Sequence, residues 1–397
     1  MRRQAIKTAA TSRISSGYEL PSAGLFALVF ASGFAGLVYQ LLWMRQLGYL
    51  YGNTSEASSV TLATFFIGLG LGSWWWGRRI HHCRNPLRLY GWLEFGIAGT
   101  ALIYFLLLGL FYLVYPRAYQ SLEWPGGLFL VKIALSFLLI FPSAFCMGGT
   151  VPVMGQVAIQ KAVHFGWKSA VLYAVNTLGA ACGVLCAAFV MIPSLGYRLS
   201  YTVAILVSLT VGVVAWRAAR MVGEGSVHDL RPETRTESGS TGISGMGRPA
   251  IGLLCFFSGF VVLALEVAWI RVFAQVHENS VYSYAIILIV VLVCLGIGAG
   301  ISSILSYRCR RPMQVLGGLL AVGGLFLVAG PFLLMQVTNE LEPVHTFEAW
   351  GVYLQRLFRM GFGGLGLAAA ALGTVFPFLM KMAERDVHLP GRTLGWM

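Results

Sequence analysis

The sequence predicts an all-α polytopic membrane protein of about ten transmembrane helices, arranged as two parallel repeats of six and four helices. Three observations predict this fold class. Hydrophobic residues make up 57% and charged residues 11% of the 397 residues, and the mean hydropathy is +0.74, whereas soluble proteins carry about 25% charged residues. An apolar motif recurs along the chain, and basic residues fall on alternate connections between apolar stretches.

The repeat is the strongest of these observations. The segment SGFAGLVYQLLWMRQ at 32–46 returns as SGFVVLALEVAWIRV at 258–272, which is 226 positions later. The same offset aligns the glycine-rich stretches and the Cys-Arg-x-Pro strings that follow them. A period this far above 50 residues indicates duplicated domains rather than a solenoid of stacked repeats.

The apolar stretches set the number of helices. About 20 apolar residues cross a bilayer core of about 30 Å as a helix, whereas barrel strands would alternate polar and apolar residues over about 10 positions. That alternation is missing, so we expect helices. Six precede the linker and four follow it; because six is even, both repeats start in the same orientation and are parallel. The expected spans are 22–44, 57–77, 89–115, 128–158, 169–193, 199–217, 251–270, 281–306, 313–337 and 353–382.

The formal net charge of +13 follows from topology. Basic residues precede the first span and follow the second, fourth, sixth and eighth spans, which is the positive-inside pattern. This pattern places the N-terminus in the cytoplasm and needs no nucleic-acid partner. The residues are Arg2, Arg3, Lys7, Arg13, Arg78, Arg79, Arg84, Arg88, Lys161, Lys168, Arg217, Arg220, Arg308, Arg310 and Arg311.

Four segments follow from these patterns: a cytoplasmic N-terminal segment over 1–21, a first six-helix repeat over 22–222, a cytoplasmic linker over 223–249 and a second repeat of four helices over 250–397. The linker is polar and rich in Gly, Ser and Thr, as expected of a flexible connection. Met397 aligns with Leu172, so we expect the second repeat to be incomplete, without counterparts of the fifth and sixth helices. Either the chain is part of a longer product, or another membrane subunit covers the exposed face.

Five motifs cover nearly the whole chain: SGFxxLVYQxxWxRxLG at 32–48, GLGLGSWWWGRR at 68–79, MGGTVPVM at 147–154, YAVNTLGAACG at 173–183 and IPSLGYR at 192–198. Together they resemble the membrane part of the bacterial spermidine-synthase-like membrane proteins, described as fused major-facilitator/spermidine-synthase proteins. The resemblance implies a major-facilitator-like fold in the bacterial inner membrane. Family members also carry a soluble aminopropyltransferase domain; nothing in this sequence resembles that domain, so we do not expect an enzyme.

No cofactor or metal site is predicted. The seven cysteines are scattered and form no CxxC pair, so they indicate neither a disulfide framework nor a zinc site. The string GFGGLG at 361–366 fits the GxGxxG pattern, but it lies within an apolar span. A dinucleotide-binding turn follows a strand and opens a βαβ unit, so helix packing is the better interpretation.

Acidic residues within spans are the first site candidates. A charged group at the centre of a membrane costs about 2.5–3.5 kcal/mol on insertion scales and usually faces a bundle interior or a water-filled cavity. Glu266 is therefore a candidate cation or proton site, with Arg271 or Gln40 of the other repeat near it. The competing interpretation is an ion pair that fixes helix packing. Glu94 and Lys132 lie near the ends of their spans, and we expect them at the membrane interface.

Asn176, Arg45 and Arg271 complete the candidates for a substrate or ion path. Asn176 could line a polar path or form a hydrogen bond between helices. Arg45 and Arg271 each follow a tryptophan by two residues. We expect these arginines to extend toward the outer interface, with Trp43 and Trp269 as anchors in the aromatic belt.

Glycines and prolines recur at related positions in both repeats. Small residues spaced four apart let helix backbones approach closely, so we expect helix packing at Gly68, Gly72, Gly296 and Gly300. Pro152 and Pro377 remove a helical N–H from the fourth span of each repeat. Matching helix breaks in two halves often mark the central site of a transporter, although each proline could also be a simple kink.

Two functions fit these patterns about equally. The first is a carrier of a small solute, with a cation such as a polyamine implied by the family resemblance. The second is a non-catalytic membrane subunit that anchors or assembles a larger complex. An aminopropyltransferase would require a catalytic domain encoded elsewhere. Fold alone does not determine function, so the alternatives stay open. The lipid bilayer is a partner in every case.

Overall fold

The computed structural model describes the chain from residue 22 to residue 383, with seven internal gaps. The expected segment 1–21 and nearly all of the expected linker 223–249 lie outside the described residues. The gaps are 52–54, 122–124, 159–164, 222–247, 278–279, 309–310 and 342–348.

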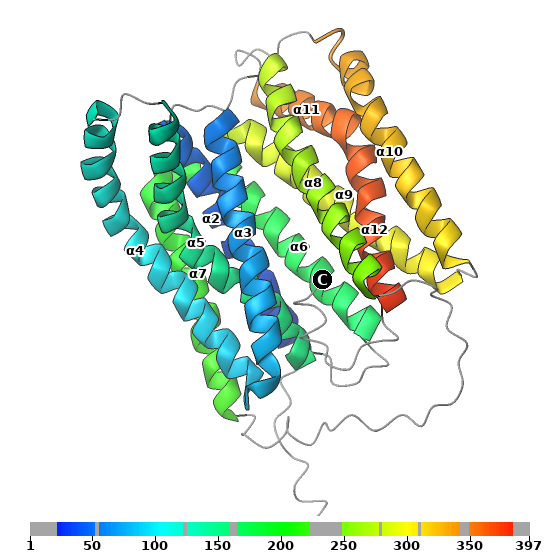
Figure 1. Ribbon diagram of the computed structural model, residues 1–397, viewed down its shortest axis with the longest axis horizontal. Helices are drawn as coiled ribbons and strands as arrows, with labels where there is room; N and C mark the ends of the chain where they lie inside the picture. The colour runs from blue at the N-terminus through cyan, green and yellow to red at the C-terminus, as the bar shows by residue number, and fades with distance from the viewer. Residues whose placement is uncertain are drawn as a thin grey trace, which may run out of the picture.

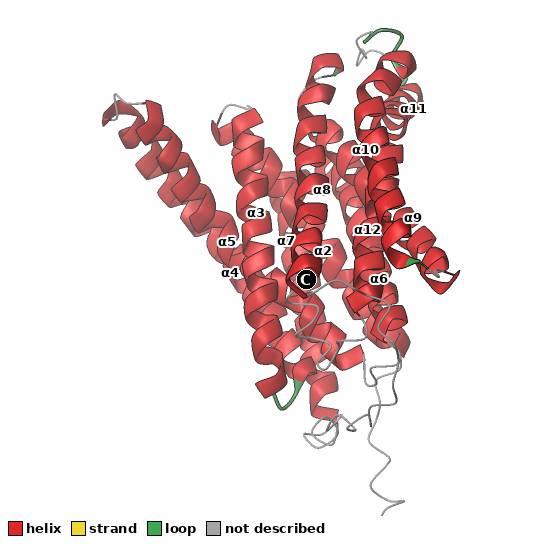
Figure 2. Ribbon diagram, turned by 45° about the vertical axis from the view of Figure 1, so that its right-hand side comes forward, coloured by secondary structure: helices red, strands yellow, loops and turns green. Residues whose placement is uncertain are grey.

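The described residues form a bundle of helices (Figures 1 and 2). Before the gap at 222–247 lie α2 (Ser22–Tyr51), α3 (Ser55–Arg79), the 3₁₀ turn η1 (Ile80–His82), α4 (Pro86–Ser121), α5 (Pro125–Ala158), α6 (Phe165–Cys186), the π-helical turn η3 (Ala187–Met191) and α7 (Ile192–Met221). After it lie α8 (Arg248–Val276), α9 (Val281–Arg308), α10 (Pro312–Val337), α11 (Trp350–Gly361), the π-helical turn η4 (Phe362–Gly366) and α12 (Leu367–Ala383).

The bundle has the dimensions of a multi-pass membrane protein. Eight helical stretches of the described chain are long and apolar enough to cross a bilayer. One of them covers 171–221, and Gly196 divides it because its φ of 75° is not helical. The break lies in the gap expected between the fifth and sixth spans. α3 is less apolar than these stretches but lies along α5 (Figure 1), so ten segments agree with the ten expected spans within the described ranges.

Helix boundaries repeat with the offset found in the sequence. α2, α3 and α4 begin at residues 22, 55 and 86, and α8, α9 and α10 begin 226 positions later, at 248, 281 and 312. α5 covers 125–158, and the continuous run of α11, η4 and α12 covers 350–383, an offset of 225 at both ends. The first four helices of the two groups therefore correspond one to one.

Glycines produce the closest helix contacts, and they repeat as well. A Cβ atom at Gly72 in α3 would lie 2.1 Å from the carbonyl oxygen of Phe145 in α5, and one at Gly68 would lie 2.6 Å from the Cβ of Ala144. In the second group, a Cβ at Gly298 in α9 would lie 2.2 Å from the carbonyl oxygen of Ala370 in α12. Helix packing at Gly68 and Gly72 agrees with the expectation.

The expected packing role of Gly296 and Gly300 is wrong. A Cβ at either residue would meet nothing within 4 Å. Gly298 lies between them in sequence and occupies the position equivalent to Gly72, so it makes the contact instead. A small-xxx-small spacing identifies one face of a helix, but it does not show whether that face or the nearly opposite face, two residues away in sequence, meets a neighbour.

The prolines do not divide their helices. Pro152 lies inside α5 and Pro377 inside α12, and both helices continue through them. The interruptions that do occur are the two π-helical turns and the kink at Gly196. Pro152 and Pro377 therefore lie within continuous helices and do not break them.

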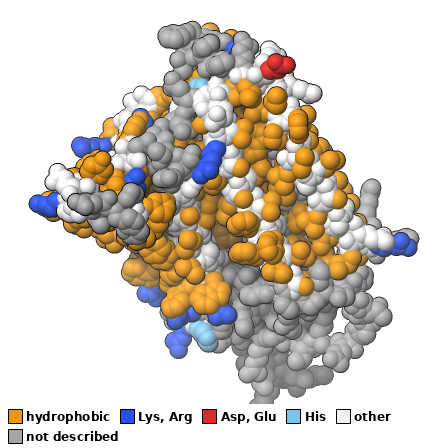
Figure 3. Space-filling view, turned by 45° about the horizontal axis from the view of Figure 1, so that its top comes forward, with side chains coloured by type: hydrophobic (Ala, Val, Ile, Leu, Met, Phe, Trp, Pro, Cys, Tyr) orange, Lys and Arg blue, Asp and Glu red, His pale blue; other side chains and the backbone are white. Residues whose placement is uncertain are grey.

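The core is aromatic, and the apolar surface is extensive. Trp43, Tyr39 and Tyr201 are fully buried, and the Trp43 Nε1 donates a hydrogen bond to the Tyr201 hydroxyl at 3.2 Å. Trp43 and Trp269 were expected as interfacial anchors, and this was wrong because both are buried in the core. Outward-facing side chains such as Leu106, at 77% exposed, are hydrophobic instead. Figure 3 shows such side chains across most of one described face, as expected for contact with lipid.

Candidate functional site

A cavity of about 360 Å³ lies between the two groups of helices, and we call it the inter-repeat cavity. Its size falls within the range of about 300–1,000 Å³ that is typical of small-molecule sites. The end of α2, the start of α7 and the start of α9 contribute its walls. The lining residues are Arg45, Tyr49, Ile192, Pro193, Ser280, Val281, Tyr282 and Tyr284.

The polar groups of the inter-repeat cavity favour negative charge. Arg45 is its only charged lining residue among those described, and the guanidinium Nε donates a hydrogen bond to the Tyr49 hydroxyl at 3.3 Å. The cavity also lies at the start of α9, where Ser280 accepts a hydrogen bond from the Ser283 N–H at 3.3 Å. Because a helix N-terminus carries partial positive charge, α9 adds to the attraction of Arg45 for an anion.

Contacts between the two groups hold the walls in place. The hydroxyls of Ser58 in α3 and Tyr284 in α9 form a hydrogen bond of 2.8 Å. Phe189 in the turn η3 stacks on Tyr282 with ring centroids 5.7 Å apart, and Tyr282 contacts Trp350 at 5.4 Å. The π-helical turn thus places an aromatic ring of the first group against the wall of the cavity, in keeping with the frequent occurrence of π-bulges at functional sites.

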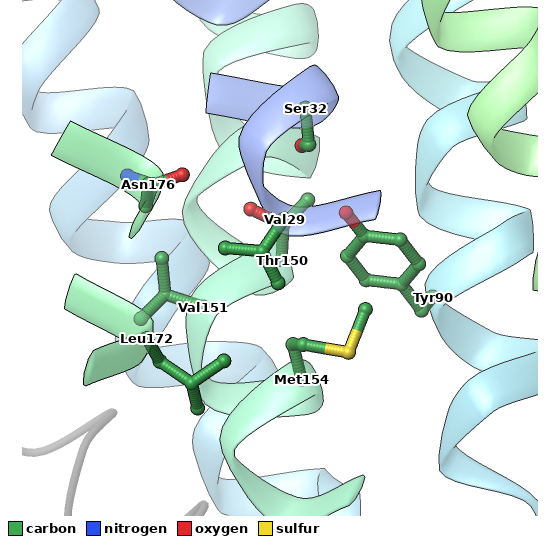
Figure 4. Close-up of a pocket in the computed structure, with 8 residues that line it drawn as sticks. All are labelled: Val29, Ser32, Tyr90, Thr150, Val151, Met154, Leu172 and Asn176. Carbon is green, nitrogen blue, oxygen red and sulfur yellow. The ribbon is translucent and has the colours of Figure 1, made fainter. Parts of the chain in front are cut away.

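A second, much smaller pocket lies inside the first group of helices, and we call it the Ser32 pocket. Its volume of about 10 Å³ is the space of one water molecule. In Figure 4, Ser32 of α2, Tyr90 of α4, Thr150 of α5 and Asn176 of α6 surround this space. The remaining lining residues are Val29, Val151, Met154 and Leu172.

Glu94 lies behind the Ser32 pocket and corrects an expectation from the sequence. It was expected at the membrane interface, but it is 0% exposed. The Ser32 hydroxyl donates a hydrogen bond of 2.5 Å to its Oε1, and the hydroxyls of Tyr90 and Ser208 lie beside its carboxyl group. Its Oε2 has no hydrogen-bond partner among the described residues. Lys132 is partly buried, and its ammonium lies 5.6 Å from the Tyr51 ring centre.

The residues selected from the sequence do not form one site. Glu266 and Gln40 are 5% and 2% exposed, and neither lines the two cavities described above. Arg271 is exposed, whereas Arg45 is half-buried and lines the inter-repeat cavity. Asn176 lines the Ser32 pocket, and a Cβ at Gly33 would lie 2.4 Å from its carbonyl oxygen. Asn176 therefore both lines a polar space and lies at a helix contact.

Sequence reasoning missed two features of these sites. The start of α9 was expected at residue 281, but the sequence did not show that it lines the same cavity as Arg45, because that depends on tertiary packing. Glu94 carried a usable signal, since it is the only acidic residue within the stretch 86–121. Glu94 was expected at the membrane interface because it lies near the end of its span, but a side chain near a helix end can still face the bundle interior.

No family model and no curated protein matches the chain. Among solved structures, the chain is similar to the human organic anion transporter MFSD10 (TETRAN), with a TM-score of 0.46 and 13% identity over 95% of this chain and 97% of that chain. It is also similar to the major facilitator superfamily transporter FucP in the outward conformation, with a TM-score of 0.36 and 16% identity over 94% of each chain. These likenesses concern the overall arrangement of helices, and at TM-scores below 0.5 they carry nothing about solute or site.

Proposed function

We propose that this chain is a membrane carrier of a small solute and that the solute binds in the inter-repeat cavity. The observation that carries the proposal is a cavity of about 360 Å³, lined by Arg45 and three tyrosines, between two corresponding groups of helices. A site between two halves that are related by parallel duplication can be opened to either side by rocking one half against the other.

The charge of the cavity favours a solute with a carboxylate or phosphate group. A guanidinium binds carboxylates and phosphates through two parallel hydrogen bonds. The start of α9 adds backbone N–H groups and partial positive charge, which also favour an anion. A polyamine-like cation, which the family resemblance implies, stays the alternative solute. It would need the buried Glu266 and Gln40 to become accessible, whereas Arg45 would repel it.

Uptake into proteoliposomes tests the proposal. Purified protein is reconstituted and given radiolabelled lactate, succinate, glycerol 3-phosphate or spermidine. We expect uptake of at least one anion, and a loss of about tenfold or more in apparent affinity for Arg45→Ala, because a hydrogen bond to a charged group contributes about 1.5–3 kcal/mol. Arg271→Ala is the matched control, since Arg271 occupies the equivalent position but is exposed.

Each result of the uptake assay has a defined meaning. Spermidine uptake that Arg45→Ala leaves unchanged and Glu266→Gln abolishes would favour the cationic alternative. Equal losses in Arg45→Ala and Arg271→Ala would remove the inter-repeat cavity as the site. No uptake of any probe above that of empty vesicles would count against a carrier of these solute classes.

The proposed location is the bacterial inner membrane with the N-terminus in the cytoplasm. Three arginines near one end of the first group support this orientation: the guanidinium groups of Arg78, Arg79 and Arg220 lie 4.3, 3.4 and 3.6 Å from the ring centres of Trp74, Trp75 and Trp216. Such pairs suit the interfacial region on the positive side of a membrane. Fluorescence of green fluorescent protein fused to the N-terminus tests the orientation, because that reporter does not become fluorescent after export in unfolded form.

A subunit of a larger membrane complex is the second candidate, and one surface favours it. In the first group, α6 covers α2: Cβ atoms at Gly179 and Gly183 would lie 2.1 and 2.3 Å from the carbonyl oxygens of Phe30 and Phe34. The equivalent surface of α8 contains Phe256, Gly259 and Phe260. No helix of the described chain covers it, and a Cβ at Gly259 would meet nothing within 4 Å.

The chemistry of α6 indicates what would fit this surface of α8: a transmembrane helix with small residues four positions apart. Phe256 and Phe260 are 64% and 57% exposed. A photo-crosslinking amino acid at position 256 is therefore expected to capture a partner helix, whereas the same probe at Leu325 of α10, which is 66% exposed, reports ordinary lipid contact. Capture of lipid alone at both positions would count against this candidate.

A further inference from the structure

Glu94 is an acidic side chain that the proposed solute site does not use. It lies in the interior of the first group, between α2, α4 and α7, and is 0% exposed. The second repeat does not reproduce it, because the position 226 residues later is Leu320, which is 40% exposed. Packing shared by the two repeats therefore does not account for an acidic residue here.

The surroundings of Glu94 supply too little to hold a negative charge. The Ser32 hydroxyl donates a hydrogen bond to Oε1, and the hydroxyls of Tyr90 and Ser208 lie beside the carboxyl group, but Oε2 lacks a partner among the described residues. No lysine, arginine or histidine of the described chain forms an ion pair with it. An ionised carboxylate without a counter-charge costs far more in an apolar interior than a neutral carboxylic acid does. The arrangement therefore needs a positive charge bound at Glu94.

The Ser32 pocket gives this carboxyl group a connection to water. Ser32 lines the pocket and donates to Glu94 at the same time. The pocket has the volume of one water molecule and polar groups from Tyr90, Thr150 and Asn176 around it, which meets the two requirements for an ordered water. Figure 4 shows these side chains converging from α4, α5 and α6 on the segment of α2 that carries Ser32.

We propose that Glu94 is the proton-binding site of the carrier and that Ser32 relays the proton between Glu94 and a water in the Ser32 pocket. In the loading direction, a hydronium in the pocket gives a proton to the Ser32 hydroxyl, and Ser32 passes its original proton to the Glu94 carboxylate. A neutral carboxylic acid and a neutral water remain. Release runs through the same steps in reverse. Ser32 is a positioning and relay residue, because it returns to its starting state.

Space decides between a proton and a metal cation. Sodium needs several oxygen ligands around it, but the carboxyl group is fully buried and the adjacent pocket holds about one water. A proton needs no volume of its own. The other titratable groups that face Glu94 are Tyr39 on α2, Tyr90 on α4 and Cys146 on α5, and α7 contributes only the hydroxyl of Ser208. All of these are neutral, so Glu94 is the group that changes charge.

Infrared spectroscopy of the purified full chain tests proton binding without any solute. We expect a carbonyl stretching band of a protonated carboxyl group at neutral pH, which Glu94→Gln removes. Ser32→Ala is expected to keep the band and move it to higher frequency, because the carboxyl group loses its hydrogen-bond donor. Glu340→Gln is the matched control on an exposed acid, and it is expected to leave the band unchanged.

Three results would overturn the proposal. The first is a spectrum that Glu94→Gln leaves unchanged, and the second is a band that Ser32→Ala does not move. The third is loss of the band when sodium chloride replaces choline chloride at constant pH, because sodium would then compete for the site. Ser32→Ala also keeps the test decisive if Glu94→Gln does not fold.

The coupling role rests on the proposed carrier function, and a second measurement separates the two. In proteoliposomes, an imposed pH gradient is expected to raise succinate uptake by the unmodified protein several-fold. Glu94→Gln is expected to lose this response while exchange of internal for external succinate continues. An infrared band without uptake of any probe would leave the proton site standing and remove the carrier, whereas gradient-driven uptake that survives in Glu94→Gln would remove the coupling role.

Discussion

The contact between α3 and α5 at Gly72 can be tested by adding a single carbon atom. In Gly72→Ala, the new Cβ would lie 2.1 Å from the carbonyl oxygen of Phe145 and 2.9 Å from its carbonyl carbon. Ordinary contacts between carbon atoms are about 3.5–4.0 Å. Because the obstacle is backbone in the middle of a helix, it cannot rotate away, and α3 and α5 must separate by about 1 Å or more to relieve the contact.

The size of the effect follows from two opposing terms. Overpacking of this kind costs about 1–3 kcal/mol, and alanine gains about 1 kcal/mol over glycine in helix propensity. Gly70→Ala receives only the second term, because a Cβ there would meet nothing within 4 Å. The propensity term cancels between the two variants, so Gly72→Ala is expected to be less stable than Gly70→Ala by about 1–3 kcal/mol.

Equilibrium unfolding in mixed micelles of dodecyl maltoside and SDS, followed by tryptophan fluorescence, measures this difference. The second repeat supplies an independent pair: Gly298→Ala would place a Cβ 2.2 Å from the carbonyl oxygen of Ala370, whereas Gly296 is open. The same ordering is expected in both pairs. Indistinguishable midpoints for Gly72→Ala and Gly70→Ala would refute the reasoning, because the two helices would then not be in contact at this glycine.

Three further predictions test other parts of the structure. Gly33→Ala is expected to destabilise the protein, because a Cβ at Gly33 would lie 2.4 Å from a backbone oxygen of α6. Gly259→Ala is expected to be tolerated, because a Cβ at Gly259 would meet nothing within 4 Å. Unfolding midpoints in the same micelles measure this difference. Trp43→Phe leaves the buried Tyr201 hydroxyl without its 3.2 Å partner and is expected to cost about 1–3 kcal/mol in unfolding free energy. Burial raises the pKa of the Cys83 thiol, so its thiolate fraction at a given pH is lowered. The rate of alkylation of Cys83, measured by mass spectrometry of its peptide, is therefore expected to rise with pH at a higher midpoint than that of free cysteine.

Each of these predictions has an outcome that contradicts it. Equal midpoints for the two glycine variants would show that α6 does not pack against α2 at this position. A Trp43→Phe protein as stable as the unmodified protein would remove the hydrogen bond as a stabilising contact. Alkylation of Cys83 with the pH profile of free cysteine would show that the thiol is open to water.

The arrangement of helices was largely predictable because duplication leaves a record in the sequence. The offset of 226 residues correctly related α2, α3 and α4 to α8, α9 and α10, and the interval between the expected spans 169–193 and 199–217 contains the break at Gly196. Packing at Gly68 and Gly72 was also predictable, since the sequence shows small residues in one stripe. These features depend on local sequence and on the number of apolar residues needed to cross a membrane, and both can be counted along the chain.

The direction in which a side chain points was much less predictable. Trp43 and Trp269 were expected at the membrane interface, because tryptophan next to arginine is typical of an aromatic belt, but the rotation of each helix buries them. Glu94 was misplaced for the same reason. Depth along a helix can be counted from the sequence, whereas rotation about the helix axis is set by tertiary contacts such as those of Gly33 and Gly72.

The hydrogen bond between Ser58 and Tyr284 has a geometric meaning beyond its strength. The two residues are 226 positions apart, so each is the other's counterpart in the duplication. Parallel repeats are related by an axis along the membrane normal, and counterparts can be in contact only close to that axis. This hydrogen bond therefore lies at the axis. The bond joins residues near the start of α3 and the start of α9, and Tyr284 also lines the inter-repeat cavity. Rocking that opens the cavity at this end separates the two halves here, so a pair of spectroscopic labels at these positions should register the opening as an increase in distance.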